Sequence, residues 1–445
     1  MNPSIVIWSI VSALAGFLFG FDTVVISGAE KTIQDLWGLS PTAHGVAMAS
    51  ALYGTVIGAL VGGWPTDRYG RRPTLIWIGV LYFVSAVWSG LATDFWTFCI
   101  ARFIGGLGVG ISTVAAPLYI SEISPPAARG RLAGLFQFNI VFGILAAFLS
   151  NWVIEGWPND WRWMLAAEAP PALAYTLACL AIPESPRWLV LRGGEDNRRR
   201  ALGVLARMDP SASPADLDAT AARIGAAAAP AAGGDDTTIG RLRRPLVLAF
   251  LIAFFNQLSG INAVLYFAPR IFEMAGLGEK AALLQSIGIG ITNLVFTFVG
   301  LWLIDRLGRR TLLVVGSLGY IASLGLCAWA FATGNTRIVP ACIFAFIAAH
   351  AVGQGAVIWV FIAEIFPDRF RATGQTVGCA THWVLAALLT TMFPLLVVKF
   401  APSTVFAFFC GMMILQLVWV LAMVPETKGV PLEEIARRMR GQQSL

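Results

Sequence analysis

Three ionisable side chains lie inside long apolar stretches of the sequence: Asp22, Arg102 and Glu168. A charge at the centre of a bilayer costs at least about 2.5 to 3.5 kcal/mol on insertion scales, so each residue needs a partner or a function. An acid that faces a cation can alternate between a carboxylate paired with that cation and a neutral, protonated acid. These residues therefore predict a site that carries a proton. The alternatives are a static Asp22–Arg102 ion pair and a Glu168 carboxyl that stays protonated.

Neutral amides and one indole in the apolar stretches could bind a polyhydroxyl ligand. An amide offers hydrogen-bond donors and an acceptor, and an indole stacks on the C–H face of a sugar ring. A single amide in a membrane helix more often bonds a neighbouring helix, and a histidine there can bond a backbone carbonyl instead. The residues that could serve such a ligand are Gln137, Asn256, Gln257, Asn262, Asn293, Trp359 and His382.

Six charged residues occupy matching places in the polar segments between the apolar stretches. Acids and bases at the inner mouth of a cavity can form a latch that is made and broken in every cycle, because a surface pair contributes at most about 1 kcal/mol. The alternative is that they anchor loops and fix topology. The candidate gate residues are Arg71, Glu122 and Arg129, matched by Arg309, Glu364 and Arg371.

The elements that must hold these residues are predicted to be membrane-spanning helices. Of the 445 residues, 57% are hydrophobic and only 13% are charged, which is too little charge to cover a soluble protein of this length. The apolar stretches are continuous and lack the alternation typical of a membrane β-barrel. The predicted fold class is an all-α polytopic membrane protein. Twelve spans are expected near 5–28, 43–64, 73–92, 96–120, 131–151, 163–182, 245–272, 281–304, 311–333, 338–363, 374–397 and 402–424.

The two halves of the sequence repeat each other. The segment DRYGRR at 67–72 recurs as DRLGRR at 305–310, and PES at 183–185 recurs as PET at 425–427, at offsets of 238 and 242 residues. Two parallel six-helix halves with a site between them are typical of an alternating-access transporter. The predicted units are a six-helix half at 1–182, a linker with short surface helices at 183–244, a second half at 245–424 and a tail at 425–445.

The basic residues predict the orientation of the chain. Of 31 Lys and Arg, 24 lie on the face that carries the 183–244 linker and only six on the other face. Basic loops stay in the cytoplasm, so both termini and the linker are expected there, and the net charge of +6 reflects topology rather than a nucleic-acid partner. Within the linker, 195–208 is expected to form an amphipathic helix and 209–236 a flexible chain.

Nothing in the sequence indicates an enzyme, a metal or a cofactor. The six cysteines lie in apolar stretches, the three histidines are scattered, and no Gly-Lys-Ser or Gly-Lys-Thr of the Walker type occurs. The glycine-rich run at 105–110 lies inside a predicted span, where small residues permit close helix packing. We therefore expect neither ATP hydrolysis nor bound metal.

Several motifs together resemble the sugar porter family of the major facilitator superfamily. They are DRxGRR in both halves, RGR at 129–131, PESPRWL at 183–189, QLSGIN at 257–262 and PETKG at 425–429, and the resemblance covers essentially the whole chain. It implies that Gln137, Gln257, Asn262 and Trp359 bind a sugar. It also implies a proton-coupled member, because such members carry an acid at the position of Asp22.

The chain departs from this family pattern at three places. Asn256 stands where the family often has a first glutamine of a pair, and His382 stands where an amide often precedes the tryptophan. The tenth predicted span lacks the prolines found in some relatives, although Gly353 and Gly355 could still allow a bend. These substitutions leave the identity of the sugar open.

The predicted function is proton-coupled symport of a monosaccharide, a hexose or a pentose, across the cytoplasmic membrane by a monomer. The alternatives are a passive uniporter of the same fold, in which Asp22 and Arg102 are static, and a sugar sensor that does not transport.

Overall fold

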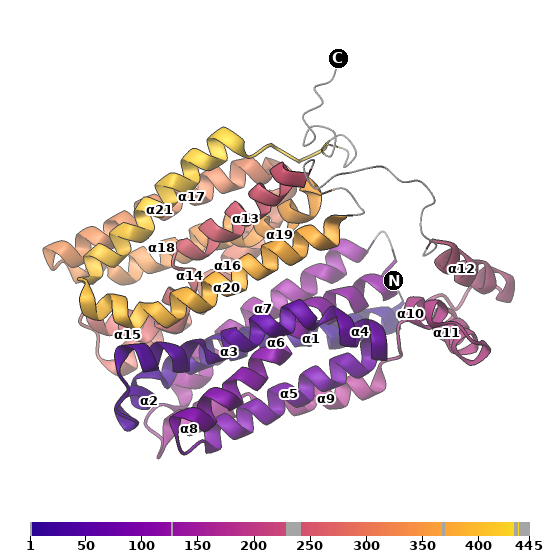
Figure 1. Ribbon diagram of the computed structural model, residues 1–445, viewed down its shortest axis with the longest axis horizontal. Helices are drawn as coiled ribbons and strands as arrows, with labels where there is room; N and C mark the ends of the chain where they lie inside the picture. The colour runs from indigo at the N-terminus through magenta and orange to yellow at the C-terminus, as the bar shows by residue number, and fades with distance from the viewer. Residues whose placement is uncertain (1, 126–127, 228–241, 367–369, 431–434, 436–445) are drawn as a thin grey trace.

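The computed structural model describes the chain apart from residues 1, 126–127, 228–241, 367–369, 431–434 and 436–445 (Figure 1). All regular structure in these described parts is helical, and twelve stretches are long and apolar enough to cross a membrane. They lie where the sequence placed them, which confirms the predicted fold class. The twelve stretches are Pro3–Gly28, Pro41–Val61, Arg71–Leu91, Phe95–Ile123, Arg131–Ile154, Asp160–Ala181, Arg243–Tyr266, Glu279–Leu307, Arg309–Thr333, Thr336–Ile365, Thr373–Lys399 and Pro402–Met423.

The helices form two bundles, which Figure 1 shows side by side, the earlier helices in indigo and magenta and the later ones in orange and yellow. The first half contains α1 (Pro3–Val25), α2 (Glu30–Leu36), α3 (Pro41–Val61), α4 (Gly63–Tyr69), α5 (Arg71–Leu91), α6 (Phe95–Ile123), α7 (Arg129–Ile154), α8 (Asp160–Ala166) and α9 (Ala169–Ala181). The second half contains α13 (Arg243–Leu258), α14 (Ile261–Tyr266), α15 (Ala268–Met274), α16 (Glu279–Leu307), α17 (Arg309–Thr333), α18 (Val339–Val352), α19 (Gln354–Ile365), α20 (Arg371–Lys399) and α21 (Pro402–Met423). Short 3₁₀ turns lie at Ile26–Gly28 and Thr336–Ile338.

Side-chain caps fix where several spans begin. The side chain of Asn2 accepts a hydrogen bond from the backbone N–H of Ser4, and that of Ser40 accepts one from Ala43; a proline follows each cap at the first helical position. Asp94 accepts two backbone N–H groups in the first turn of α6. The caps satisfy N–H groups that have no partner within the helix.

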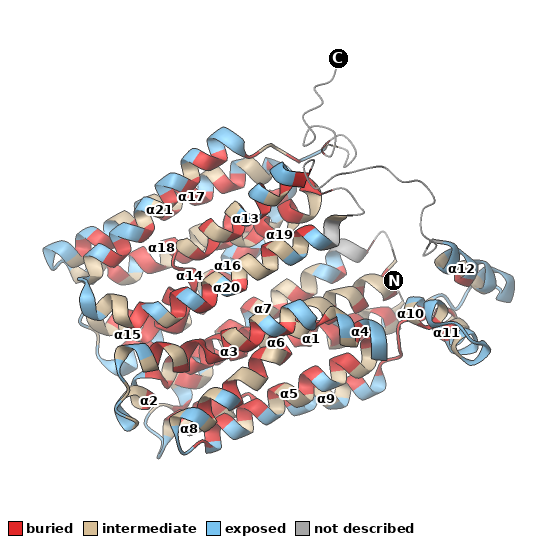
Figure 2. Cartoon of the chain, viewed as in Figure 1, coloured by how far each residue is buried: buried red, intermediate tan, exposed pale blue. Residues whose placement is uncertain are grey.

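Large apolar side chains are exposed on the outward faces of the bundle. Leu91 is 68% exposed, Trp77 65% and Trp302 57%. Figure 2 shows buried residues running between the helices and exposed residues on outer faces and helix ends. A bilayer solvates such apolar faces, whereas water does not.

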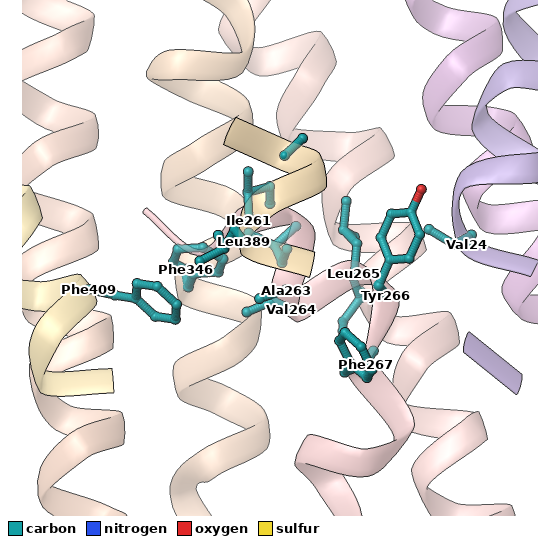
Figure 3. Close-up of a cluster of buried hydrophobic side chains, with 14 of the residues drawn as sticks. Val24, Ile261, Ala263, Val264, Leu265, Tyr266, Phe267, Phe346, Leu389 and Phe409 are labelled. Carbon is teal, nitrogen blue, oxygen red and sulfur yellow. The ribbon is translucent and has the colours of Figure 1, made fainter. Parts of the chain in front are cut away.

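Three spans are interrupted: the sixth between α8 and α9, and the seventh and the tenth at glycines. The seventh span stops at Leu258 and resumes at Ile261, because Gly260 adopts a left-handed conformation with φ of 87°. A side chain at Gly260 would also meet the ring of Phe409, which Figure 3 shows beside the apolar residues of α14. The tenth span breaks at Gly353, between Val352 and Gln354, one of the two glycines that could allow a bend there.

The linker holds three short helices, α10 (Pro186–Arg192), α11 (Glu195–Met208) and α12 (Pro214–Ala227). The predicted helix at 195–208 is confirmed. The expected flexible chain at 209–236 is wrong for α12. Ser213 and Asp216 cap each other there: the backbone N–H of each donates to the side chain of the other at 3.1 and 3.3 Å. Such a capping box, followed by alanines with high helix propensity, is sufficient to start a helix.

The two ends of the bundle carry different residues. We call one the Arg-rich end, defined by Arg71, Arg72, Arg309 and Arg310 at the starts of α5 and α17. The other, which we call the opposite end, carries α2, α8 and α15 (Figure 1).

Candidate functional site

Asp22 and Arg102 form a buried ion pair between α1 and α6. Arg102 Nη1 donates to Asp22 Oδ1 at 2.6 Å, and Nη2 donates to the backbone carbonyl of the same residue at 2.9 Å. Both side chains are 1% exposed. The carboxylate therefore has its strongest contact with a guanidinium that water does not reach, and removing one partner would leave an uncompensated buried charge.

Glu168 joins this pair to make a cluster of two acids and one base. It lies at the break between α8 and α9, is fully buried, and has no hydrogen-bond partner for either carboxylate oxygen among the described residues. Its charge interacts with both Asp22 and Arg102. Arg102 Nε also lacks a partner in the described structure. One proton on the two acids would balance the charge of the cluster, which suits a site that gains and loses a proton.

Gln257 is the centre of a second polar cluster, between α13, α14 and α20. Its Nε2 donates to Asn256 Oδ1 at 3.1 Å, and its Oε1 accepts from Asn262 Nδ2 at 2.8 Å. The same Nε2 lies 3.1 Å from both ring nitrogens of His382. The break at Gly260 brings Asn262 back towards Gln257, so the αL glycine positions two amides of one span side by side.

A cavity of about 130 Å³ lies between the two halves next to this cluster. A water-sized sphere occupies roughly 10–15 Å³ by the same measure, so the cavity has room for about ten such spheres, close to the size of a small sugar. Six of the seven predicted ligands line it: Gln137, Asn256, Gln257, Asn262, Asn293 and His382.

Trp359, the seventh predicted ligand, does not line this cavity. Its ring packs 5.3 Å from that of His382, behind the cavity wall. Gln375 Nε2 donates to its backbone carbonyl at 3.2 Å. In this conformation the ring of Trp359 therefore packs against His382.

The other residues that line the cavity include Phe19, Thr23, His350 and Trp383, which the sequence did not single out. Phe19 and Thr23 lie on α1 within one turn of Asp22, so their spacing from this acid could have indicated that they lie near the site. His350 is held by a 2.6 Å hydrogen bond between its Nδ1 and the hydroxyl of Tyr320, which leaves Nε2 available. No spacing in the sequence revealed that contact.

The gate residues form one pair in each half at the Arg-rich end. Arg71 donates twice to Glu122 at 2.9 Å, and Arg309 donates twice to Glu364 at 2.8 and 3.1 Å. The side chains of Arg129 and Arg371 lie outside the described structure. The described pairs stay within a half, so this conformation shows no latch across the halves among these four residues.

A further acid completes each pair, and the one in the first half is buried. Glu184 accepts backbone N–H groups from Arg71 at 2.9 Å and from Ser185 at 2.7 Å. Burial raises the pKa of Glu184, while those N–H groups act to lower it. Glu426 accepts from Arg309 in the second half in the same way, at 2.9 Å. The repeat in the sequence is thus also a repeat of hydrogen bonds.

Twelve spanning helices in two similar halves, with a polar cavity between them, define a membrane transporter. The family described as "Sugar (and other) transporter" matches residues 8–439. The chain belongs to this sugar porter family of the major facilitator superfamily, as the motifs predicted, and is a transporter, not an enzyme.

Curated relatives cover nearly the whole chain. The "Arabinose-proton symporter" of Bacillus subtilis is 34% identical over 450 residues, 97% of this chain and 94% of its own. The "D-xylose-proton symporter" of Escherichia coli K12 is 33% identical over 476 residues, 96% of this chain and 94% of its own. Among solved structures, the inward open conformation of the xylose transporter XylE from E. coli superposes with a TM-score of 0.85 at 30% identity, covering 96% of this chain and 98% of that one.

Proposed function

We propose that this protein is a proton-coupled monosaccharide symporter of the cytoplasmic membrane that moves a pentose or hexose. The observation that carries the proposal is the sharing of one helical turn of α1 by the two sites. Phe19 and Thr23 line the cavity, while Asp22 between them binds Arg102. A proton that loosens Asp22 from Arg102 acts directly on the wall of the sugar cavity.

The second half approaches the proton cluster through Tyr266. It lies on α14 one turn after Asn262, points towards Val24 of α1 (Figure 3), and interacts electrostatically with Asp22 and Arg102. A sugar held by Asn262 would therefore pull on the helix that covers the proton cluster. Each ligand then favours one conformation through its different affinity for the two states.

We infer the cycle from these contacts. A proton on Asp22 replaces the charged contact to Arg102, the sugar bonds the amides around Gln257, and the halves rotate about the cavity. At the Arg-rich end, Arg71, Glu122 and Arg129 would meet Arg309, Glu364 and Arg371 when the opposite end opens. The excess of Lys and Arg supports a cytoplasmic location for the Arg-rich end, both termini and the linker.

Sugar uptake into vesicles with and without an imposed pH gradient tests this function. The wild type is expected to accumulate sugar only with the gradient, and Asp22→Asn is expected to lose accumulation while it still exchanges sugar at equilibrium. Asp94→Asn, which alters an exposed helix cap, is the matched control. Accumulation by Asp22→Asn, or by the wild type without a gradient, would refute the coupling. Equal, gradient-independent uptake by both proteins would identify a passive uniporter.

A further inference from the structure

Ion pairs that join the two halves lie only at the opposite end of the described structure. There are three of them: Glu30–Arg270 at 2.8 Å, Lys31–Glu273 at 2.9 Å and Glu155–Lys280 at 3.6 Å. The described ion pairs at the Arg-rich end stay within one half. In the described structure, ion pairs between the halves therefore lie at one end of the cavity, and the four described gate residues, Arg71, Glu122, Arg309 and Glu364, are not among them.

Glu30 is the most buried residue of these pairs, with 2% of its side chain exposed. One carboxylate oxygen accepts a hydrogen bond from Arg270 Nε. The other lies 3.0 Å from Nε2 of His44, a fully buried ring. Arg270 also donates to Gln34 at 2.6 Å. An acid of the first half that is almost fully buried thus binds a base of the second half that is 19% exposed, and a partly buried charge pair is stronger than one in water.

Glu30 and Arg270 occupy equivalent positions in the two halves. Arg270 follows Glu30 by 240 residues, within the 238 to 242 residue offset of the sequence repeat. Parallel repeats are related by an axis along the membrane normal, and residues near a two-fold axis meet their own equivalents. Two equal charges would repel there. This chain instead has an acid in one copy and a base in the other, which makes the contact attractive.

The pair is mechanically linked to the cavity. Arg270 lies on α15, which follows α14 with only Phe267 between them, and α14 carries Asn262. The ring of His44 meets that of Phe267 edge-on, with the ring centres 5.9 Å apart. A shift of α14 when Asn262 binds or releases sugar would move Arg270 relative to Glu30.

We propose that Glu30 and Arg270 form the latch that closes the outer mouth of the transporter. That the contact closes the outer mouth of a transporter rests on the proposed function. That the two halves are joined at this end rests on the ion pairs alone. Breaking the latch favours the conformation open at the opposite end.

Distance measurements between spin labels test the latch without any sugar. Labels at Asp35 on α2 and Glu279 on α16, in a full-length chain with the native cysteines replaced, report opening at this end. Glu30→Gln and Arg270→Gln are each expected to raise the ratio of open to closed molecules at least tenfold. Lys280→Gln is the matched control, because Lys280 is 70% exposed in the longest of the three pairs, and we expect less than a twofold change. Wild-type distances in both latch variants would overturn the proposal.

The double variant E30Q/R270Q guards against misfolding, since each single variant leaves one buried charge without its partner. If the two residues act through each other, the double variant opens far less than the product of the single effects. Independent, multiplying effects would overturn the latch. Failure of the wild type to transport sugar, with the distance shifts intact, would overturn the proposed function and leave the latch standing.

Discussion

Removal of the Gln257 side chain is the sharpest test of the sugar site. This side chain contacts Asn256, Asn262 and His382 at 2.8 to 3.1 Å and is fully buried beside the cavity. A neutral hydrogen bond contributes about 0.5–1.5 kcal/mol net. If Gln257 gives two such bonds to a sugar, Gln257→Ala weakens binding by about 1–3 kcal/mol, or about 5- to 150-fold.

Gln354→Ala is the matched control for this prediction. Gln354 is an equally buried amide in a broken span, but it bonds Gln416 at 3.0 Å and does not line the cavity. Both variants remove a buried amide and are expected to lower the thermal unfolding temperature by similar amounts. Only Gln257→Ala should lose affinity.

The assay is calorimetric titration of the purified, detergent-solubilised protein with xylose, arabinose and glucose in turn. The sugar that binds the wild type most tightly is then used for both variants. An affinity of Gln257→Ala within threefold of the wild type would place the sugar elsewhere. An equal loss in Gln354→Ala would show that buried amides act through stability alone.

Three further predictions follow from the geometry. Trp359→Ala is expected to weaken binding in the same titration by less than tenfold, because Trp359 supports His382 and does not reach the cavity; a loss as large as that of Gln257→Ala would show that it contacts the sugar in another conformation. Gly260→Ala is expected to destabilise the protein by about 1–3 kcal/mol, because Gly260 has a positive φ. The control Gly278→Ala should change the melting temperature little, because Gly278 has open space around it. Equal shifts of the melting temperature in the two variants would contradict this prediction. Glu184→Ala removes the acceptor of several backbone N–H groups, and each hydrogen bond to a charged partner contributes about 1.5–3 kcal/mol. The unfolding temperature of this variant should therefore fall well below that of the exposed control Glu195→Ala.

The sequence predicted the spans well because hydrophobicity alone decides which segments enter a bilayer. It predicted the Asp22–Arg102 pair for the same reason, since two opposite charges in hydrocarbon have few alternatives to each other. Trp359 shows the limit. Hydropathy places a residue in a span but gives no rotation about the helix axis, and the bend at Gly353 sets which way α19 faces.

Glu30 and His44 were missed because they lie at the ends of spans, where charges are ordinary. Their burial arises only when α15 of the second half packs against α2, a contact between residues about 240 apart. The helix α12 was missed for a local reason. Its alanine and proline composition suggested a flexible chain, while the capping pair Ser213 and Asp216 decided the outcome.

The repeat offset also relates the two chemistries of this protein. Asn262 follows Asp22 by 240 residues, the same separation as Glu30 and Arg270. Equivalent positions in the two halves therefore carry the acid of the proton cluster in one copy and an amide of the sugar cavity in the other. Each lies within ten residues of one member of the Glu30–Arg270 pair. Under the proposed function, an acid and an amide at equivalent positions would respond to different ligands and would move the same pair of helix ends, which would give both ligands control of one closure.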